Sequence, residues 1–177
     1  MRLNGEFVYL TSITYNDTDD IVRWRNKDSV RRFFIYREEF TAESHKRWLE
    51  DTVMTGKAIQ FIIREKKTNL KIGSVYLKDI DKKNRKCEFG IFIGEEEKTG
   101  IGYGREAALL ATNYAFKQLG INKVYLRVLS ENLRAYKSYL SSGFKKEGVF
   151  EQDVWIEGKA YDIIFMAKFA TKEYKKS

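Results

Sequence analysis

Apolar and polar residues alternate along several segments of the chain, and this period of two is typical of β-strands. The alternation is clearest in the segment that follows Lys86. One face of this predicted strand carries Cys87, Phe89, Ile91 and Ile93, and the other carries Glu88, Gly90, Phe92 and Gly94. Glu88 is therefore the one charge between residues 87 and 94, and we expect it to stand alone among apolar neighbours.

A helical period replaces the alternation after residue 104. The apolar positions there recur every three or four residues, at Ala107, Leu110, Ala111, Tyr114 and Ala115. Such a stripe predicts a helix that packs on a sheet. Further helices are expected over residues 19–27 and 42–53, and a short one begins after Asn132, a good N-cap, and ends at Gly143.

The remaining alternating segments complete the predicted sheet. They cover residues 6–13, 58–65, 71–79, 123–129, 144–150 and 160–169, the last two forming an antiparallel pair around residues 157–159. This order predicts a single α/β domain over residues 1–170, with a mixed, mostly antiparallel sheet and helices on both faces. A basic tail over residues 171–177 is expected to follow it.

A glycine-rich turn joins the Glu88 strand to the long helix. Gly100, Gly102 and Gly104 are spaced by single residues, which places free backbone N–H groups at a helix N-terminus, where they can hold a phosphate. No Lys-Ser or Lys-Thr pair follows, so the turn is not the P-loop of nucleotide hydrolases. A dinucleotide fingerprint lacks its acidic residue after the next strand. Two interpretations of the turn remain. It is either a loop that binds the pyrophosphate of coenzyme A or a turn without a ligand.

The segment after the next strand points to one family. Asn132, Arg134, Ala135, Tyr139, Gly143 and Phe144 form a run that resembles the motif ending the acetyl-CoA-binding half of GNAT N-acetyltransferases. The turn from Thr99 to Gly104 resembles the pyrophosphate loop of that family, and the two motifs stand in the right order. Thr99 departs from the Gln or Arg that is common at its position.

The resemblance implies a fold in which two central strands splay apart, and acetyl-CoA as the co-substrate. It implies that the cofactor is held by Phe92, Ile93, Thr99, Gly100, Ile101, Gly102, Tyr103, Gly104, Arg105, Asn132 and Ala135. Tyr139 matches the family tyrosine near the sulfur and is the predicted general acid. Glu88 is the predicted general base, because burial among apolar neighbours raises the pKa of a carboxyl group. Simple acyl-CoA binding, as in a non-catalytic module, needs neither residue.

The N-terminal half refines the hypothesis about the acceptor. Trp24-Arg25-Asn26 and a later helix with His45 and Trp48 resemble a subset that includes ribosomal-protein N-terminal acetyltransferases and enzymes that acetylate nucleotide-linked amino sugars. Trp24, Arg25, Asn26 and His45 are therefore the predicted substrate-binding residues, although packing on helix faces is an alternative for the tryptophans and half-exposure for His45. A nucleotide-linked amino sugar is the leading acceptor. A protein N-terminus and a polyamine or aminoglycoside are the alternatives.

The composition of the chain limits the classes of partner that we expect. The 177 residues carry a formal net charge of +8, yet no recognition-helix pattern is present, and anionic coenzyme A accounts for a basic chain. A nucleic acid is therefore not an expected partner. No long apolar run or signal-peptide pattern occurs, so a membrane is not an expected partner either. One cysteine, Cys87, predicts a cytoplasmic protein with a core thiol, and with one histidine it predicts no metal site. A homodimer is common in the resembled family.

Overall fold

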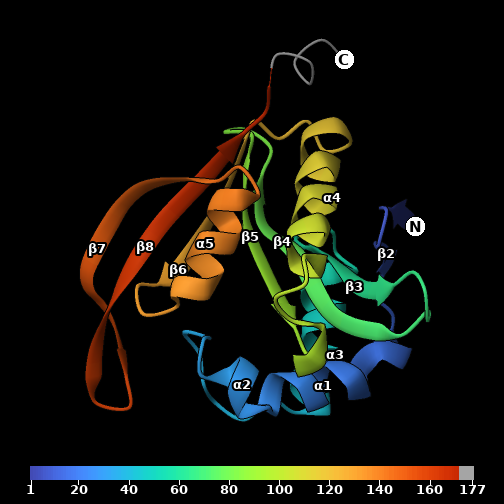
Figure 1. Cartoon of the computed structure of the whole chain (residues 1–177), viewed down its shortest axis with the longest axis horizontal. Coiled ribbons are helices and arrows are strands. Elements are labelled where there is room, and N and C mark those ends of the chain that lie inside the picture. The colour runs from blue at the N-terminus through green and yellow to red at the C-terminus, as the bar shows by residue number, and fades with distance from the viewer. Residues whose placement is uncertain (172–177) are drawn as a thin grey trace.

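The computed structural model describes residues 1–171 and contains one twisted sheet with helices on both faces (Figure 1). The strands lie in the order β1-β2-β3-β4-β5-β6-β8-β7, and every neighbouring pair is antiparallel except β5 with β6. Their bounds are β1 Arg2–Asn4, β2 Val8–Ser12, β3 Ile59–Glu65, β4 Lys71–Asp81, β5 Lys86–Ile93, β6 Lys123–Leu129, β7 Lys145–Ile156 and β8 Lys159–Phe169. The predicted mixed, mostly antiparallel α/β fold is confirmed.

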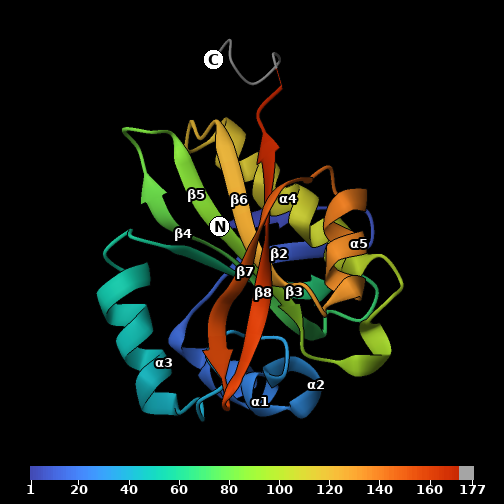
Figure 2. The ribbon, with the colours of Figure 1, turned by 90° about the vertical axis from the view of Figure 1, so that its left-hand side faces the viewer.

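The helices divide between the two faces of the sheet (Figures 1 and 2). One face is covered by α4 (Tyr103–Lys117) and α5 (Leu133–Ser141), and the other by α1 (Thr18–Asn26), α2 (Asp28–Arg31) and α3 (Ala42–Trp48). The alternation of β5 follows this division. Cys87 and Phe89 belong to the core under α4, whereas Phe92 packs with Trp24 of α1 on the opposite face.

The two central strands separate part-way along their length, as the resemblance to the GNAT family implied. The parallel ladder between β5 and β6 ends at the pair of Glu88 with Tyr125. Past that point β5 continues to pair with β4 as far as Ile93, and β6 continues to pair with β8 as far as Leu129. The edges of β5 and β6 that face each other therefore lack a strand partner, which opens a gap in the middle of the sheet.

The long hairpin of β7 and β8 reaches beyond the predicted strand 144–150. Glu157 and Gly158 have positive φ values of 52° and 78°, which closes a tight turn whose twist suits two long strands. Its apolar side chains Ile156 and Ile163 pack with Ile35 of the segment that follows α2. The hairpin thereby holds that segment next to the gap between β5 and β6 (Figure 1).

Three other details differ from the sequence-based expectations. The short elements β1 and α2 were not predicted, because three or four residues show too little periodicity. The predicted helix 42–53 is α3 followed by a π-helical segment, η2 (Leu49–Val53).

Apart from Thr171, the predicted basic tail lies outside the described residues. No helix within residues 1–171 is long and apolar enough to cross a bilayer.

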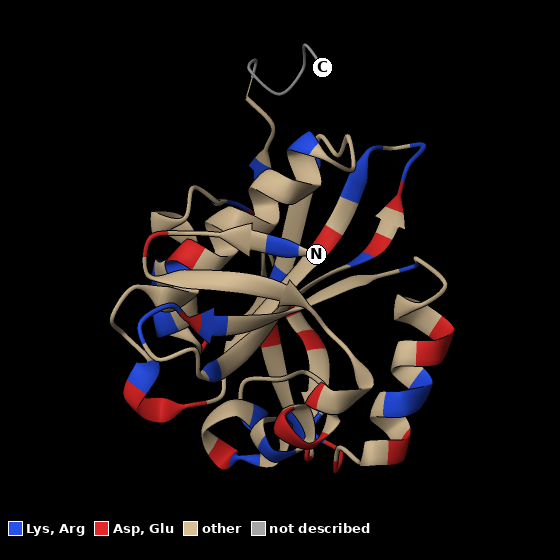
Figure 3. Ribbon diagram, turned by 90° about the vertical axis from the view of Figure 1, so that its right-hand side faces the viewer, with Lys and Arg blue, Asp and Glu red and all other residues tan. Residues whose placement is uncertain are grey.

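On the face that Figure 3 shows, the positions of Lys and Arg alternate with those of Asp and Glu along α3 and its surroundings. Charge concentrated on one face is the usual footprint of a nucleic-acid-binding domain. The mixed distribution on this face does not resemble such a footprint.

His45 lies buried between α3 and α1. Its side chain is 1% exposed, its Nδ1 is 3.0 Å from the hydroxyl oxygen of Thr18, and its Nε2 has no hydrogen-bond partner within the described residues. Burial lowers the pKa of His45 to about 4, and the charge of Asp17 opposes this shift only partly. The imidazole is therefore neutral in the folded protein at neutral pH.

We expect His45 to make folding sensitive to mild acid. In the unfolded chain a histidine takes up its proton near pH 6.5, whereas the folded chain takes it up only near pH 4. The contribution of His45 is thus fully present above pH 6.5 and is lost as the pH falls toward 4, by up to roughly 3 kcal/mol. Denaturant unfolding of the wild type and of His45→Gln at several pH values measures it. The difference in unfolding free energy between the two proteins should shrink over this window, and a constant difference would contradict the assignment.

Candidate active site

A cleft of about 650 Å³ passes through the gap between β5 and β6. Its walls on the α4–α5 face come from the glycine-rich turn and from α5. Its walls on the other face come from the segment around α2 and from β4. The residues that line it and were predicted from the sequence are Glu88, Phe92, Ile93, Thr99, Gly100, Gly102, Gly104, Arg105, Asn132, Ala135 and Tyr139. Ile101 and Tyr103 do not line it.

The glycine-rich turn presents open backbone at the start of α4. Gly102 is the N-cap of this helix and has a φ of +97°, a left-handed value that favours glycine. A side chain added at Gly100 or Gly102 would meet no atom of the protein within 4 Å, so the space beside both residues is free for a ligand. The first N–H groups of α4 have no partner within the helix and can donate to an anion.

The charged and hydroxyl groups near this turn have different roles. Thr99 donates its hydroxyl hydrogen bond to the carbonyl oxygen of Glu96 at 2.6 Å, so this side chain closes the turn. Arg105 and Arg134 line the cleft and form no ion pair with the residues described. Either guanidinium can therefore supply the positive side chain that Thr99 does not.

Glu65 fixes the glycine-rich turn from the end of β3. Its carboxylate accepts hydrogen bonds from Lys98 at 2.9 Å, from the Tyr103 hydroxyl at 2.7 Å, and from Thr68. The hydrogen bond from Thr68, followed by those from Lys98 and Tyr103, lowers the pKa of Glu65 to about 2. Because Lys98 and Tyr103 stand on either side of residues 99–102, Glu65 holds both ends of the turn.

Glu95 ties the same turn to α1. Its carboxylate accepts the indole N–H of Trp24 at 2.6 Å and pairs with Arg23 at 2.8 Å and Lys27 at 3.0 Å. Burial raises the pKa of Glu95, but the hydrogen bonds from these three side chains outweigh burial and lower it to about 2. The Trp24 ring lies against Gly94, where any side chain would collide with it.

Glu88 lies at the point where β5 and β6 separate and is 8% exposed. The sequence predicted an isolated charge, and the structure differs. Arg127 of β6 donates two hydrogen bonds to the carboxylate, at 3.1 and 3.3 Å, and Lys78 of β4 lies 3.6 Å from it. Its neighbours are therefore two cations rather than apolar groups, because β4 and β6 both bring a basic side chain to this point. The apolar surroundings from which the sequence predicted Glu88 as a general base are thus absent, and that role stays a prediction.

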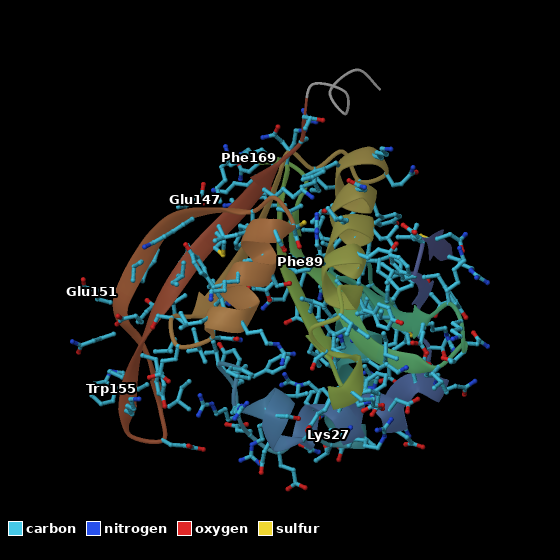
Figure 4. All side chains as sticks on the ribbon, in the orientation of Figure 1. Lys27, Phe89, Glu147, Glu151, Trp155 and Phe169 are labelled. Carbon is cyan, nitrogen blue, oxygen red and sulfur yellow. The ribbon has the colours of Figure 1, made fainter. Side chains whose placement is uncertain are left out.

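Tyr139 projects from α5 into the cleft on the opposite side of the gap. Its ring packs edge-on against Phe89 of β5, with ring centroids 6.2 Å apart (Figure 4 labels Phe89 between α4 and α5). Burial, with a smaller contribution from Tyr76, raises the pKa of Tyr139 far above its ordinary value. The phenol therefore stays protonated at neutral pH, which a group that donates a proton requires.

Tyr76 is a cleft residue that sequence analysis missed. Its position on β4 is paired with Gly90 of β5, and the end of its phenol occupies the space where a side chain of residue 90 would begin. Lys78 and Arg127 were missed as well. The alternation of β4 and β6 shows which side chains share a face, but only the register of the sheet shows that these residues meet Glu88.

The four residues predicted to bind the acceptor do not line the cleft. Trp24 is fully buried against Gly94, and Asn26 makes two hydrogen bonds with the backbone of Phe40, at 2.8 and 2.9 Å. His45 is buried between two helices, as described above. Arg25 stacks on the ring of Phe34, and, like Nε2 of His45, its Nη1 is buried without a partner in the described structure.

The fold and the two motifs agree with a comparison against family models. Residues 8–145 match the model described as an acetyltransferase (GNAT) domain. The chain belongs to the GNAT acetyltransferase family. It is accordingly an acetyl-CoA-dependent N-acetyltransferase. That the glycine-rich turn at the start of α4 holds the pyrophosphate of coenzyme A stays a prediction.

Two individual relatives each match at least two thirds of this chain. A spermidine N(1)-acetyltransferase of Vibrio cholerae is 33% identical over 118 residues, which cover 67% of this chain and 67% of that protein. An uncharacterized protein of Methanocaldococcus jannaschii, MJ1062, is 32% identical over 84% of this chain, which spans only 30% of that protein's length. These relatives do not support the narrower resemblance to the ribosomal-protein and amino-sugar enzymes.

A solved structure confirms the fold. The crystal structure of spermidine N-acetyltransferase from Vibrio cholerae, in complex with CoA and spermine, superimposes with a TM-score of 0.87. The match covers 97% of this chain and 100% of that chain, at 23% identity. The arrangement of splayed strands and flanking helices is therefore that of a GNAT enzyme.

We expect Gly102→Val to abolish acetyl-CoA binding, because the new side chain fills the space beside the helix N-terminus. Its left-handed backbone adds a folding cost of about 1–2 kcal/mol. Gly56→Val is the matched control, since Gly56 also has a positive φ and open surroundings but lies outside the cleft. Titration of both variants with acetyl-CoA, followed by melting temperature, measures the effect. Similar stability with loss of the ligand-induced shift in Gly102→Val alone is the expected result, and normal binding would contradict the location of the pyrophosphate.

Proposed function

We propose that this enzyme acetylates a primary amine on a molecule that also carries anionic groups, with a nucleotide-linked amino sugar as the leading class. The observation that carries the proposal is the charge of the cleft on the face away from α4 and α5. We call this region the acceptor half and define it by Ser29, Val30, Arg32–Tyr36, Tyr76, Lys78, Glu88 and Arg127.

The acceptor half is positively charged. Arg32, Lys78 and Arg127 line it, and Glu88 is its only carboxylate within the described residues. Glu88 is already paired with Lys78 and Arg127. A polyamine carries several positive charges and needs carboxylates that are free to pair with them, whereas an anionic acceptor meets attractive charges here. The exposed rings of Phe33 and Tyr36 add flat apolar surface suited to a base or sugar ring.

The residues around the gap can support direct transfer. Acetyl-CoA supplies the acetyl group as a thioester, and the acceptor amine must be neutral when it reacts. We assign Glu88 as the group that takes up the proton of the amine, since it is the carboxylate at the separation of β5 and β6. We assign Tyr139, on the other side of the gap, as the donor of a proton to the departing sulfur. The rigid walls hold both partners together, which contributes a large part of the rate.

A polyamine is the second candidate acceptor. It is favoured by the relative from Vibrio cholerae, a spermidine N(1)-acetyltransferase that is 33% identical over two thirds of this chain. A non-catalytic acyl-CoA-binding module is the alternative of another class for the cleft itself. A cleft that holds Glu88 and Tyr139 on either side of the gap favours catalysis, because binding alone needs neither group.

The acceptor proposal predicts a charge preference among amines. With acetyl-CoA saturating, release of free thiol should be measured with glucosamine, glucosamine 1-phosphate, a uridine-diphosphate-linked amino sugar and spermidine. We expect kcat/KM to rise by at least about tenfold from glucosamine to its phosphate, since one added charge attraction of about 1.4 kcal/mol has this effect. Added salt should reduce the difference. Efficient acetylation of spermidine with none of any amino sugar would establish the polyamine alternative instead.

Tyr139→Phe should lower kcat by roughly one to three orders of magnitude, because it removes a proton donor. The affinity for acetyl-CoA should change little, because the ring and its packing on Phe89 are retained. Tyr136→Phe is the matched control, since this tyrosine lies on the same helix but does not line the cleft. Single-turnover kinetics separate the chemical step from product release. An unchanged chemical step in Tyr139→Phe would remove this residue from the mechanism.

A further inference from the structure

Tyr76 lines the cleft but has no part in the mechanism proposed so far. It lies on β4 opposite Gly90 of β5, and both residues line the cleft. Because residue 90 has no side chain, the end of the Tyr76 ring extends over the backbone of β5 at this point. Gly90 lies two residues beyond Glu88, where the ladder between β5 and β6 ends, so the phenol reaches the open part of the gap.

The hydroxyl group of Tyr76 has no hydrogen-bond partner within residues 1–171. In the same part of the chain, the side-chain polar atoms that are both buried and unpartnered belong to Arg25, Ser29 and His45. The hydroxyl of Tyr76 is not one of these enclosed atoms and is accessible from the cleft that it lines. A phenol can donate one hydrogen bond and accept another, so a ligand in the cleft can use it in either way.

The surroundings of Tyr76 keep its phenol protonated. Burial of the ring raises the pKa of Tyr76 above its ordinary value, the charge of Arg25 opposes this shift, and the charge of Glu88 adds to it. The hydroxyl therefore keeps its proton at neutral pH, and its oxygen can still accept a hydrogen bond. Tyr76 thus does not compete with Glu88 for the proton of an amine.

Tyr76 and Glu88 reach the gap from the same face of the sheet. The register of β4 and β5 pairs Tyr76 with Gly90 and Lys78 with Glu88, so Tyr76 is a diagonal neighbour of Glu88. Tyr139 lies on the other side of the gap, near enough for Tyr76 to contribute to its raised pKa. An amine that enters from the acceptor half therefore meets both Tyr76 and Glu88 before it reaches the side of Tyr139.

We propose that the hydroxyl oxygen of Tyr76 accepts a hydrogen bond from the reacting amine and orients it for attack. The proposal rests on the role proposed above for Glu88. A neutral primary amine has two N–H groups and one lone pair. When one N–H group donates to Glu88 and the other to Tyr76, the lone pair is left for the carbonyl carbon of the thioester.

The transfer step then balances without a change at Tyr76. The bond between nitrogen and the acetyl carbon forms, and the bond between that carbon and sulfur breaks. Glu88 takes one proton from the nitrogen, and Tyr139 gives one to the sulfur. Tyr76 neither gains nor loses a proton, and its contact strengthens as positive charge develops on the attacking nitrogen.

Tyr76→Phe tests the contact with two amines that differ by one N–H group. The probes are whichever of the four amines named above gives the highest kcat/KM, and its derivative methylated on the same nitrogen, with acetyl-CoA saturating. We expect the variant to lower kcat/KM for the primary amine by about tenfold, the effect of losing one hydrogen bond. For the methylated amine we expect a loss of less than about threefold, because its one N–H group is used by Glu88 and no hydrogen bond to Tyr76 is lost.

Tyr125→Phe is the matched control, since Tyr125 is paired with Glu88 across β5 and β6 but does not line the cleft. It should leave both values unchanged, and the KM for acetyl-CoA should be the same in both variants. An unchanged kcat/KM for the primary amine in Tyr76→Phe, or an equal loss for the two amines, would overturn the contact. A purely structural role of Tyr76 gives the second of these results, because it does not depend on methylation of the amine.

Gly90→Ala tests the position of the hydroxyl, because the new side chain would collide with the end of the Tyr76 ring. We expect it to reproduce the loss seen in Tyr76→Phe, and we expect the double variant to lose no more than either single variant. Gly148→Ala is the matched control, since Gly148 lies on β7 with open space beside it and outside the cleft. Losses that multiply in the double variant would contradict the position assigned to the hydroxyl.

The two proposals fail in different ways. If spermidine is the efficient acceptor and Tyr76→Phe still discriminates between the primary and the methylated amine, the contact stands and the anionic acceptor class is wrong. If a phosphorylated amine is preferred and Tyr76→Phe behaves like the wild type, the acceptor class stands and the contact is wrong.

Discussion

The loss of pairing between β5 and β6 beyond Glu88 is the constraint on which the site depends. A sheet whose central strands stay paired has no room for a ligand, because side chains and helices fill both faces. Here each strand keeps its outer partner, so the sheet remains continuous at one end and open at the other. The opening gives access to both faces at once, and a donor from one side can meet an acceptor from the other.

The open end needs support that the missing strand pairs no longer supply. Two carboxylates provide much of it on the cofactor side. Glu65 holds the residues that flank the glycine-rich turn, and Glu95 fastens the start of the same segment to α1. Because α1 leads directly into the residues around α2, the contacts of Glu95 connect the wall of the acceptor half to the turn that suits the pyrophosphate.

Charge is distributed unequally across the gap. The acceptor half concentrates Arg32, Lys78 and Arg127 around a single carboxylate, and Arg25 lies unpaired behind Phe34. The spermidine N(1)-acetyltransferase of Vibrio cholerae, by contrast, is named for a cationic substrate. Membership of the GNAT family accounts for the acetyl transfer, and the choice of acceptor is what we propose for the side chains on the other face of the sheet.

The sequence by itself determined the features that depend on near neighbours. The alternation in β5, the helical period of α4, the cap at Asn132 and the glycine-rich turn are local patterns, and each appears in the structure where it was predicted. The glycine at position 102 allows the left-handed backbone angle that begins α4, and this too is a local property of the chain. The motif that contains Tyr139 could be recognised for the same reason.

Only the tertiary structure decided which distant residues meet. Glu88 looked isolated because the chain shows its neighbours on β5 alone, whereas Lys78 and Arg127 reach it through the register of two other strands. Trp24, Asn26 and His45 looked available for a ligand. Each is instead hydrogen-bonded to a residue of another part of the chain, namely Glu95, Phe40 and Thr18. Pairing across a sheet depends on register and helix docking, and neither leaves a periodic trace in one sequence.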